Sequence, residues 1–168
     1  MPDIAIRPAR PADADRLQEL NRVALRQVDA YVEGVADSDL DDVVSHYDGD
    51  GGAFLVGEVD GDVVAMGGLQ PADGGVWTDR ALRSDDGPAA EITRMRVDPD
   101  HQRRGYGSRL LDALEAQARE SGFEVLVLDT TARQTGARAL YESTGYERVE
   151  AFEWRTYEVL LYRKELSD

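Results

Sequence analysis

The segment from residue 91 to residue 128 constrains the fold most strongly. Residues 91–97 read as a strand, residues 106–118 repeat apolar side chains at helical spacing, and residues 125–128 (Val-Leu-Val-Leu) form an uninterrupted apolar run. Such a run is typical of a parallel strand buried on both faces. Strand, helix and strand in this order predict a βαβ unit at the centre of the domain.

The N-terminal half adds antiparallel strands to this unit. Residues 4–7 predict a short first strand that Pro8 ends, and Pro11 can occupy the first turn of a helix. Residues 53–59 and 63–69 flank an Asp-Gly turn and predict a hairpin. The expected helix carries its apolar side chains on one face, which we expect to pack on the sheet: Leu17, Leu20, Ala24 and Val28.

Two connections have a less regular pattern. Residues 35–46 suggest a short second helix, followed by a turn. Residues 71–88 are rich in Gly, Asp and Pro, with Trp77 as their one large anchor. This composition predicts a mobile connection that could border a substrate site.

The C-terminal part completes the sheet. A helix over residues 136–144 ends at Gly145, and residues 146–154 and 157–162 predict a terminal antiparallel pair of strands. In residues 91–97 the apolar phase slips after Ile92, which a β-bulge would explain. The chain is therefore expected to form one α+β domain over residues 1–168, with a mixed, mostly antiparallel sheet of six to seven strands flanked by about four helices.

Composition excludes several classes of protein. With 19 basic and 34 acidic residues the net charge is −15, and Lys164 is the only lysine. This charge disfavours nucleic-acid binding and suits a protein adapted to concentrated salt. The absence of cysteine removes disulfides, thiolate metal sites and cysteine nucleophiles, and His46 and His101 lack metal-ligand spacing, so no metal is expected. No apolar run suggests a membrane span, and we expect a cytoplasmic protein.

One loop interrupts the acidic pattern. Residues 94–109 contain five arginines and two aspartates. Gly105 and Gly107 flank Tyr106, where the expected helix begins. Glycine permits close approach to a ligand, and free N–H groups at a helix start favour an anion. The loop therefore predicts a phosphate site. The alternative is a structural turn whose arginines pair with nearby acids.

The residues Gln102-Arg103-Arg104-Gly105-Tyr106-Gly107 match the signature Gln/Arg-x-x-Gly-x-Gly/Ala of the GNAT superfamily of acyl-CoA-dependent N-acyltransferases. The order of elements resembles this family over nearly the whole chain. The resemblance implies that the loop, with Ser108, holds the pyrophosphate of acetyl-CoA.

A second family pattern is Asn-x-x-Ala-x-x-x-Tyr-x-x-x-Gly-Phe/Tyr. It is matched by Ala137, Tyr141, Gly145 and Tyr146, while Gln134 stands where Asn is usual. The resemblance implies that Gln134 and Ala137 face the cofactor. It also implies that the pantetheine arm pairs with the exposed backbone of Met95, Arg96 and Val97 like an added strand. The alternative is a fully paired core strand.

Three groups are candidates for the chemistry that the resemblance implies. Glu91 is a candidate proton acceptor for the amine, the N–H of Val97 a donor to the developing oxyanion, and Tyr141 an acid for the leaving thiolate. From the residues alone, Glu91 is equally well a solvated surface carboxylate, and Tyr141 an ordinary core tyrosine. No cysteine can carry the acyl group, so direct attack in a ternary complex is expected.

The sequence thus predicts an acetyl-CoA-dependent N-acetyltransferase acting on a small-molecule amine or a peptide amine. The acyl group, the acceptor and the choice between monomer and homodimer stay open. Two other classes of protein remain as alternatives. A catalytically silent acyl-CoA-binding sensor would keep the glycine loop without Glu91 and Tyr141, and a scaffold domain would need neither.

Overall fold

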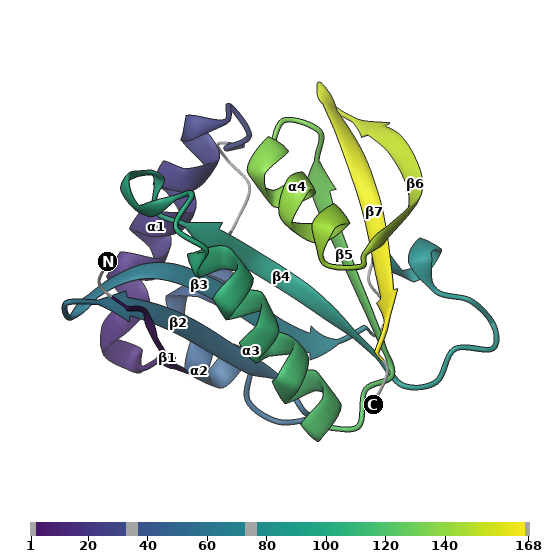
Figure 1. Ribbon diagram of the computed structural model, residues 1–168, viewed down its shortest axis with the longest axis horizontal. Helices are drawn as coiled ribbons and strands as arrows, with labels where there is room; N and C mark the ends of the chain where they lie inside the picture. Colours follow the sequence, from purple (N-terminus) through teal and green to yellow (C-terminus); the bar gives the residue numbers. More distant parts are fainter. Residues whose placement is uncertain (1–2, 33–36, 73–76, 167–168) are drawn as a thin grey trace.

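A computed structural model describes residues 3–32, 37–72 and 77–166. Its seven strands form one sheet in the order β1-β2-β3-β4-β5-β7-β6 (Figure 1). Among the strands of the described residues, only β4 and β5 pair in parallel, so the sheet is mixed and mostly antiparallel, as predicted. The strands are β1 Ala5–Pro8, β2 Ala53–Val59, β3 Asp62–Pro71, β4 Ala89–Val97, β5 Val125–Thr131, β6 Glu147–Trp154 and β7 Tyr157–Glu165.

In the part of the chain that the structure describes, four α-helices cover the two faces of the sheet. Helix α1 (Ala14–Gln27) follows a 3₁₀ turn that begins at Pro11, and with α2 (Val43–His46) it packs on β2 and β3. Helices α3 (Tyr106–Glu120) and α4 (Thr135–Ser143) lie on the opposite face (Figure 1). The long helices are amphipathic, and burial of their apolar stripes is the main force that fixes them on the sheet.

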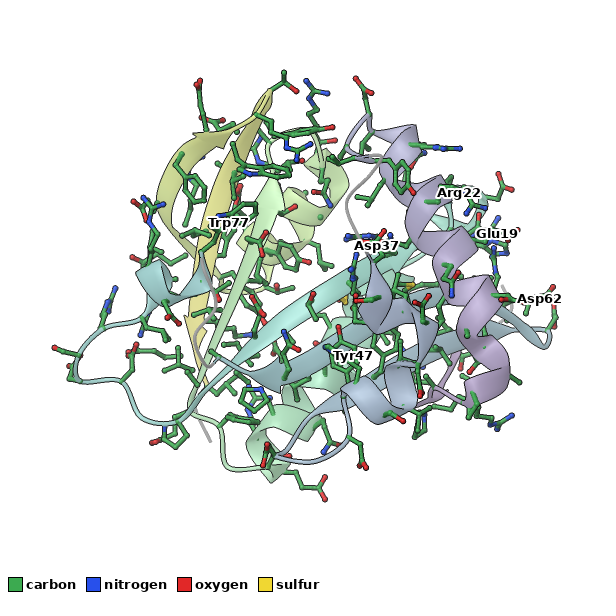
Figure 2. The ribbon with its side chains drawn as sticks, turned by 180° about the vertical axis from the view of Figure 1, so that it is seen from behind. Glu19, Arg22, Asp37, Tyr47, Asp62 and Trp77 are labelled. Atoms are coloured by element: carbon green, nitrogen blue, oxygen red, sulfur yellow. The ribbon has the colours of Figure 1, made fainter. Side chains whose placement is uncertain are left out.

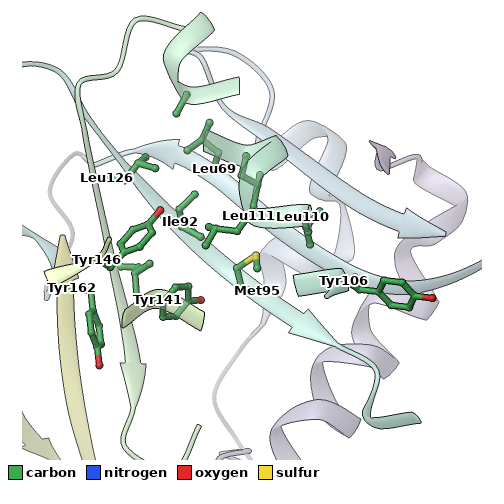
Figure 3. Close-up of a cluster of buried hydrophobic side chains, with 14 of the residues drawn as sticks. Leu69, Ile92, Met95, Tyr106, Leu110, Leu111, Leu126, Tyr141, Tyr146 and Tyr162 are labelled. Carbon is green, nitrogen blue, oxygen red and sulfur yellow. The ribbon is translucent and has the colours of Figure 1, made fainter. Parts of the chain in front are cut away.

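The core under α3 and α4 contains the residues that the helical spacing predicts. Leu110, Leu111 and Leu114 of α3 are fully buried against the sheet. The ring of Tyr141 meets Tyr146 edge-on with centroids 5.6 Å apart, and lies 6.0 Å from the ring of Tyr162 (Figure 3). These aromatic contacts fix the orientation of Tyr141 on α4.

The predicted bulge in β4 is confirmed. Pairing with β3 shifts register between Met66 and Gly68, and Arg94 on β4 has a left-handed φ of 58°. The extra residue restores Met95 to the core after Ile92. It also turns Arg94 toward the opposite face, where Asp39 accepts two of its hydrogen bonds.

The prediction of one short helix over residues 35–46 is wrong for the described residues. Residues 37–46 form a 3₁₀ turn (Ser38–Asp41) and the single turn α2, while residues 35 and 36 lie outside the described ranges. The break falls at Asp42, whose φ of −152° is not helical and whose carboxylate accepts a hydrogen bond from the N–H of Ser45. Capping by this side chain starts a new helix instead of continuing the first.

The connection over residues 71–88 is only partly irregular. β3 extends to Pro71, residues 78–81 form a 3₁₀ turn, and residues 73–76 lie outside the described ranges. The prediction that this connection is mobile stays a prediction. β4 begins at Ala89, two residues earlier than expected.

A buried polar cluster joins α3 to the C-terminal strands. The carboxylate of Glu115 accepts hydrogen bonds from the hydroxyl of Tyr146 (2.8 Å) and from Nζ of Lys164 (3.0 Å), and Lys164 also donates to the carbonyl of Thr144. Glu115 is only 4% exposed, so each partner is needed to offset the lost hydration of its charge. The chain's one lysine therefore has a structural role.

Candidate active site

The site begins where β4 and β5 separate. Their parallel pairing ends at Glu91 and Val127, after which the two strands diverge (Figure 1). From Ile92 to Val97 the edge of β4 that would face β5 has no paired strand among the described residues. The open edge leaves main-chain donors and acceptors available to a ligand.

The glycine loop closes one end of this opening. Arg103 and Gly105 both have left-handed backbones (φ 63° and 81°), and Gly105 immediately precedes the first turn of α3. The side-chain amide of Gln102 donates to the carbonyl of Val97 at 3.1 Å, which ties the loop to the end of β4. Alternating left-handed residues before a helix gather N–H groups toward one side, the geometry that binds phosphate.

The arginines of this region are not all neutralised by the protein. Arg94 pairs with Asp37 and Asp39, and Arg109 pairs with Asp3. For Arg96, Arg103 and Arg104, no ion pair is found with any residue in the described ranges. The loop thus keeps positive charge for an anion, in contrast to the alternative of a turn whose arginines are paired internally.

A first cleft of about 640 Å³ runs from this loop along β4 to α4. It is lined by Tyr141 and by every residue that the sequence assigns to the cofactor except Arg104 and Gly105: Met95, Arg96, Val97, Gln102, Arg103, Tyr106, Gly107, Ser108, Gln134 and Ala137. A Cβ built on Gly107 would lie 3.4 Å from Leu140 and 3.5 Å from Val97, so little room remains for a larger side chain. We call this the cofactor cleft, since a glycine cradle and unpaired arginines fit phosphate groups and the open strand edge fits an extended ligand.

A second cleft of about 470 Å³ opens on the opposite face of the sheet, and we call it the acceptor cleft. Asp37 and Tyr47 lie on one side of it and Trp77 on the other (Figure 2). Arg96, Met95, Gln134 and Tyr141 line both clefts. The two clefts therefore meet at the point where β4 and β5 separate.

Asp129 is a carboxylate of the acceptor cleft that is not among the site residues predicted from the sequence. It lies on β5 two residues beyond the last pair with β4, and its side chain is open to solvent inside the cleft. Reduced hydration between the walls, together with the negative charge of Glu91, raises the pKa of Asp129 to about 6. The sequence carries a signal for it, because Asp129 is the acid that ends the apolar run 125–128.

Glu91 lies beside this cleft, not in it. Its carboxylate accepts a hydrogen bond from the side-chain amide of Gln70 at 2.8 Å and faces a shallow cleft shared with His46 and Tyr47. It influences Asp129 through its charge. Glu91 is thus held by a protein partner, in contrast to a freely solvated surface carboxylate.

Tyr141 lies at the junction of the two clefts and is 4% exposed. Within the described ranges its hydroxyl has no hydrogen-bond partner. Burial raises the pKa of Tyr141 above its ordinary value, while the charge of Arg96 acts in the opposite direction. The phenol therefore keeps its proton at neutral pH and has a hydroxyl available for a ligand.

The side-chain amide oxygen of Gln134 contacts the turn between β5 and α4, in which Gln134 itself lies. Its Oε1 accepts hydrogen bonds from the N–H and the hydroxyl of Thr131, at 3.0 and 3.1 Å. These contacts fix the turn that leads into α4. The glutamine therefore has a structural role in this turn, and it also lines both clefts.

The sequence of this chain matches the model of the Acetyltransferase (GNAT) family over residues 17–146. The chain belongs to the GNAT acetyltransferase family. Among relatives of this family, the uncharacterized N-acetyltransferase YjgM of Escherichia coli is 34% identical over 116 residues. That match covers 69% of this chain and 64% of YjgM, so the chain accounts for somewhat less than two thirds of this relative's length.

Solved GNAT structures share the fold over almost the entire chain. An acetyltransferase of the GNAT family from Staphylococcus aureus Mu50 superposes with a TM-score of 0.81 at 17% identity, covering 98% of this chain and all of the other. A putative acetyltransferase from Salmonella typhimurium, determined with its cofactor acetyl-CoA, has a TM-score of 0.73 at 25% identity. The superposition covers 99% of this chain and 95% of the Salmonella chain. These likenesses show that the chain has the fold of the GNAT acetyltransferases.

Two kinds of feature are not found in the part of the chain that the structure describes. No helix there is long and apolar enough to cross a lipid bilayer. No three His, Cys, Asp or Glu side chains of these residues are grouped so that they could hold a metal ion.

Proposed function

We propose that this GNAT protein transfers the acetyl group of acetyl-CoA to a primary amine by direct attack within a ternary complex. The observation that carries the proposal is the meeting of the two clefts at Arg96 and Tyr141, where β4 and β5 separate. One cleft has the glycine loop and unpaired arginines, and the other has carboxylates and aromatic side chains. A donor and an acceptor bound on opposite faces would face one another there.

Bound acetyl-CoA would supply an activated thioester, and the chain's own residues position it. Main-chain N–H groups of residues 103–108 and the guanidinium groups of Arg103 and Arg104 would hold the pyrophosphate. The open edge of β4 at Met95, Arg96 and Val97 would pair with the pantetheine arm. The N–H of Val97 would then donate a hydrogen bond to the acyl oxygen, where negative charge develops.

The amine must lose a proton before it attacks, because an alkyl ammonium has a pKa of about 10. We propose that Asp129 receives this proton, since it lines the acceptor cleft and its pKa of about 6 leaves it ionised at neutral pH. Glu91 acts beside it, because its negative charge adds to the effect of burial in raising the pKa of Asp129. Glu91, the proton acceptor predicted from the sequence, thus influences proton transfer through its effect on Asp129.

The departing thiolate of CoA needs a proton at the junction of the two clefts, on the side away from Asp129. Tyr141 is the candidate donor, because its hydroxyl is unpaired within the described residues and burial keeps it protonated. The charge of Arg96 stabilises the phenolate left after transfer, and solvent restores the proton. Asp129 and Tyr141 thereby act as base and acid on opposite sides of the reacting atoms.

Release of free thiol from acetyl-CoA in the presence of a panel of primary amines, in molar KCl, tests the proposal. Amine-dependent release, with an acetylated product of the expected mass, is the predicted result. Calorimetric titration with CoA separates the alternatives. Binding without release would identify a sensor, and absence of binding would identify a scaffold domain.

A further inference from the structure

Arg96 is a cation without a carboxylate partner in the described part of the chain. Its Nε donates to Oδ1 of Asn21 at 3.0 Å and one Nη donates to the carbonyl of Met95 at 2.9 Å. The other Nη makes no hydrogen bond to a described residue. Burial, and then the neighbouring charge of Arg94, lower the pKa of Arg96 to about 10, so the charge is held in an unfavourable position.

Arg94 shows the contrasting arrangement two residues earlier on the same strand. Its guanidinium contacts Asp39 at 2.7 Å and Asp37 at 3.0 Å, and Tyr47 donates a further hydrogen bond to Asp39. These ion pairs hold the segment after α1 against β4. Arg94 is therefore satisfied within the protein, whereas Arg96 has donors available to a ligand.

Asp129 is the matching anion in the acceptor cleft. Arg96 and Asp129 both line this cleft, and each one's pKa responds to the charge of the other. They form no ion pair, because no nitrogen of Arg96 lies within 4.0 Å of the carboxylate. Two opposite charges thus face a common space and are separated by a gap.

The far wall of the acceptor cleft is aromatic. The ring of Trp77 lies 5.4 Å from the ring of Trp154 and 5.5 Å from that of Phe152, and both tryptophans line the cleft. Neither tryptophan is fully buried. These rings offer a binding surface for an apolar group that extends away from the charged residues.

We propose that the acceptor is a free α-amino acid with an apolar side chain. Its carboxylate would pair with Arg96, its amine would lie at Asp129, and its side chain would contact Trp77 and Trp154. A guanidinium binds carboxylate through a planar pair of donors, and a zwitterion presents a carboxylate and an ammonium group to these two opposite charges. A peptide N-terminus or a polyamine lacks the carboxylate that would satisfy Arg96. This inference rests on the N-acetyltransferase function proposed above.

Matched acceptors test the inference directly. Phenylalanine, tryptophan, tyrosine and leucine are each compared with the amine that lacks the carboxylate and with the corresponding amino-acid amide. For at least one of the four, kcat/KM for the amino acid is expected to exceed that for its amine and its amide by about tenfold or more. The inference is wrong if, for all four amino acids, kcat/KM for the amine or the amide equals or exceeds kcat/KM for the amino acid.

Arg96→Met tests whether the guanidinium is responsible. The ratio of kcat/KM for the preferred amino acid to that for its amine is expected to fall at least about tenfold, whatever the absolute rates. Arg109→Met is the matched control, because Arg109 is an exposed arginine that pairs with Asp3 and lines neither cleft. An unchanged ratio in Arg96→Met overturns the assignment of the carboxylate to Arg96.

A binding measurement separates failure of this inference from failure of the enzyme proposal. The same four amino acids and their amines are titrated calorimetrically into the protein saturated with CoA, which cannot transfer an acetyl group. Amino-acid binding that weakens in Arg96→Met supports the inference even if no acceptor is acetylated. If none of the four amino acids binds more tightly than its amine, the inference is wrong, even if amines are acetylated.

Discussion

The two clefts differ in what forms their surfaces. The cofactor cleft relies on main chain: a loop with two left-handed residues, a helix start and the open edge of β4. The acceptor cleft relies on side chains from separate elements, among them Asp37, Trp77, Arg96, Asp129 and Trp154. Main-chain contacts depend on the fold more than on residue type, whereas side-chain contacts change with single substitutions. One fold can therefore keep one cofactor while its acceptors vary.

The largest effect is expected at the junction of the two clefts. Tyr141→Phe removes the proposed acid and keeps the ring that packs on Tyr146 and Tyr162. We expect kcat to fall by about 10²–10⁴-fold with little change in the KM for acetyl-CoA or in thermal stability. Steady-state kinetics and a melting curve measure the three quantities.

Tyr146→Phe is the matched control for that substitution. The hydroxyl of Tyr146 donates to the buried carboxylate of Glu115, away from both clefts. Its removal should lower the melting temperature and leave kcat nearly unchanged. A kcat for Tyr141→Phe within about twofold of the parent, with chemistry rate-limiting, would make Tyr141 a packing residue.

A substitution confined to the cofactor cleft should affect the cofactor alone. Gly107→Val places two extra methyl groups in a space where the first added carbon already lies 3.4 Å from Leu140. We expect the Kd for CoA to rise about tenfold or more, which corresponds to about 1.4 kcal/mol. Gly107→Ala adds only that first carbon and should bind CoA more nearly like the parent. Unchanged CoA affinity in a folded Gly107→Val protein, judged by far-ultraviolet circular dichroism, would remove the loop from the cofactor site.

The acceptor cleft should respond to pH. The proposed base must be ionised in the free enzyme, so kcat/KM for the amine should fall about tenfold for each pH unit below a pKa of about 6. Asp129→Asn should lower the rate and abolish this acidic limb. Persistence of the limb in the variant would assign it to another group.

Stability gives an independent check on Asp129. Its pKa is raised in the folded protein, so the protonated form is favoured by the fold, and stability falls as pH rises from about 4 through about 6. Asp129→Asn removes this loss, and its melting temperature at pH 8 should match or exceed that of the parent. A clear drop at pH 8 would show that the ionised carboxylate is a structural partner instead.

The smallest effect concerns the negative charge of the whole surface. With a net charge of −15, we expect the melting temperature to rise by a few degrees from dilute buffer to molar KCl, because about 1 kcal/mol shifts a domain of this size by about 2–4 °C. The affinity for CoA, measured in parallel, should fall as salt screens the loop arginines. A flat or falling melting profile would contradict adaptation to salt.

The sequence predicted the two clefts unequally, for a physical reason. The strand, loop and helix of residues 91–118 are contiguous, so their spacing alone indicates a phosphate-binding turn, and the open edge of β4 followed from family resemblance. Asp129 and Arg96 line the same opening only because β4 and β5 diverge there. The position of Asp129 directly after the apolar run 125–128 is a local signal, but it does not show that this acid, among 34, faces that opening.

The dependence on contacts between distant residues also explains the parts of the fold that differ from the prediction. The amphipathic helix after Pro11, the hairpin and the βαβ unit each have a strong periodic signal, and all are confirmed. The broken helix around Asp42 depends on one carboxylate that caps Ser45. Asp37 and Asp39 just before it are held by Arg94, a partner more than 50 residues away in the sequence. Such contacts are set by tertiary structure and leave little trace in local composition.

A crystal structure of the acetyl-CoA complex would show where the cofactor and its acetyl group lie. Pyrophosphate oxygens are expected within hydrogen-bond distance of the main-chain N–H groups of residues 103–108. The acetyl group is expected at the junction of the two clefts, with Tyr141 on one side and Asp129 on the other. Phosphates bound away from this loop, or an acetyl group directed away from the acceptor cleft, would show that the proposed transfer between the two clefts is wrong.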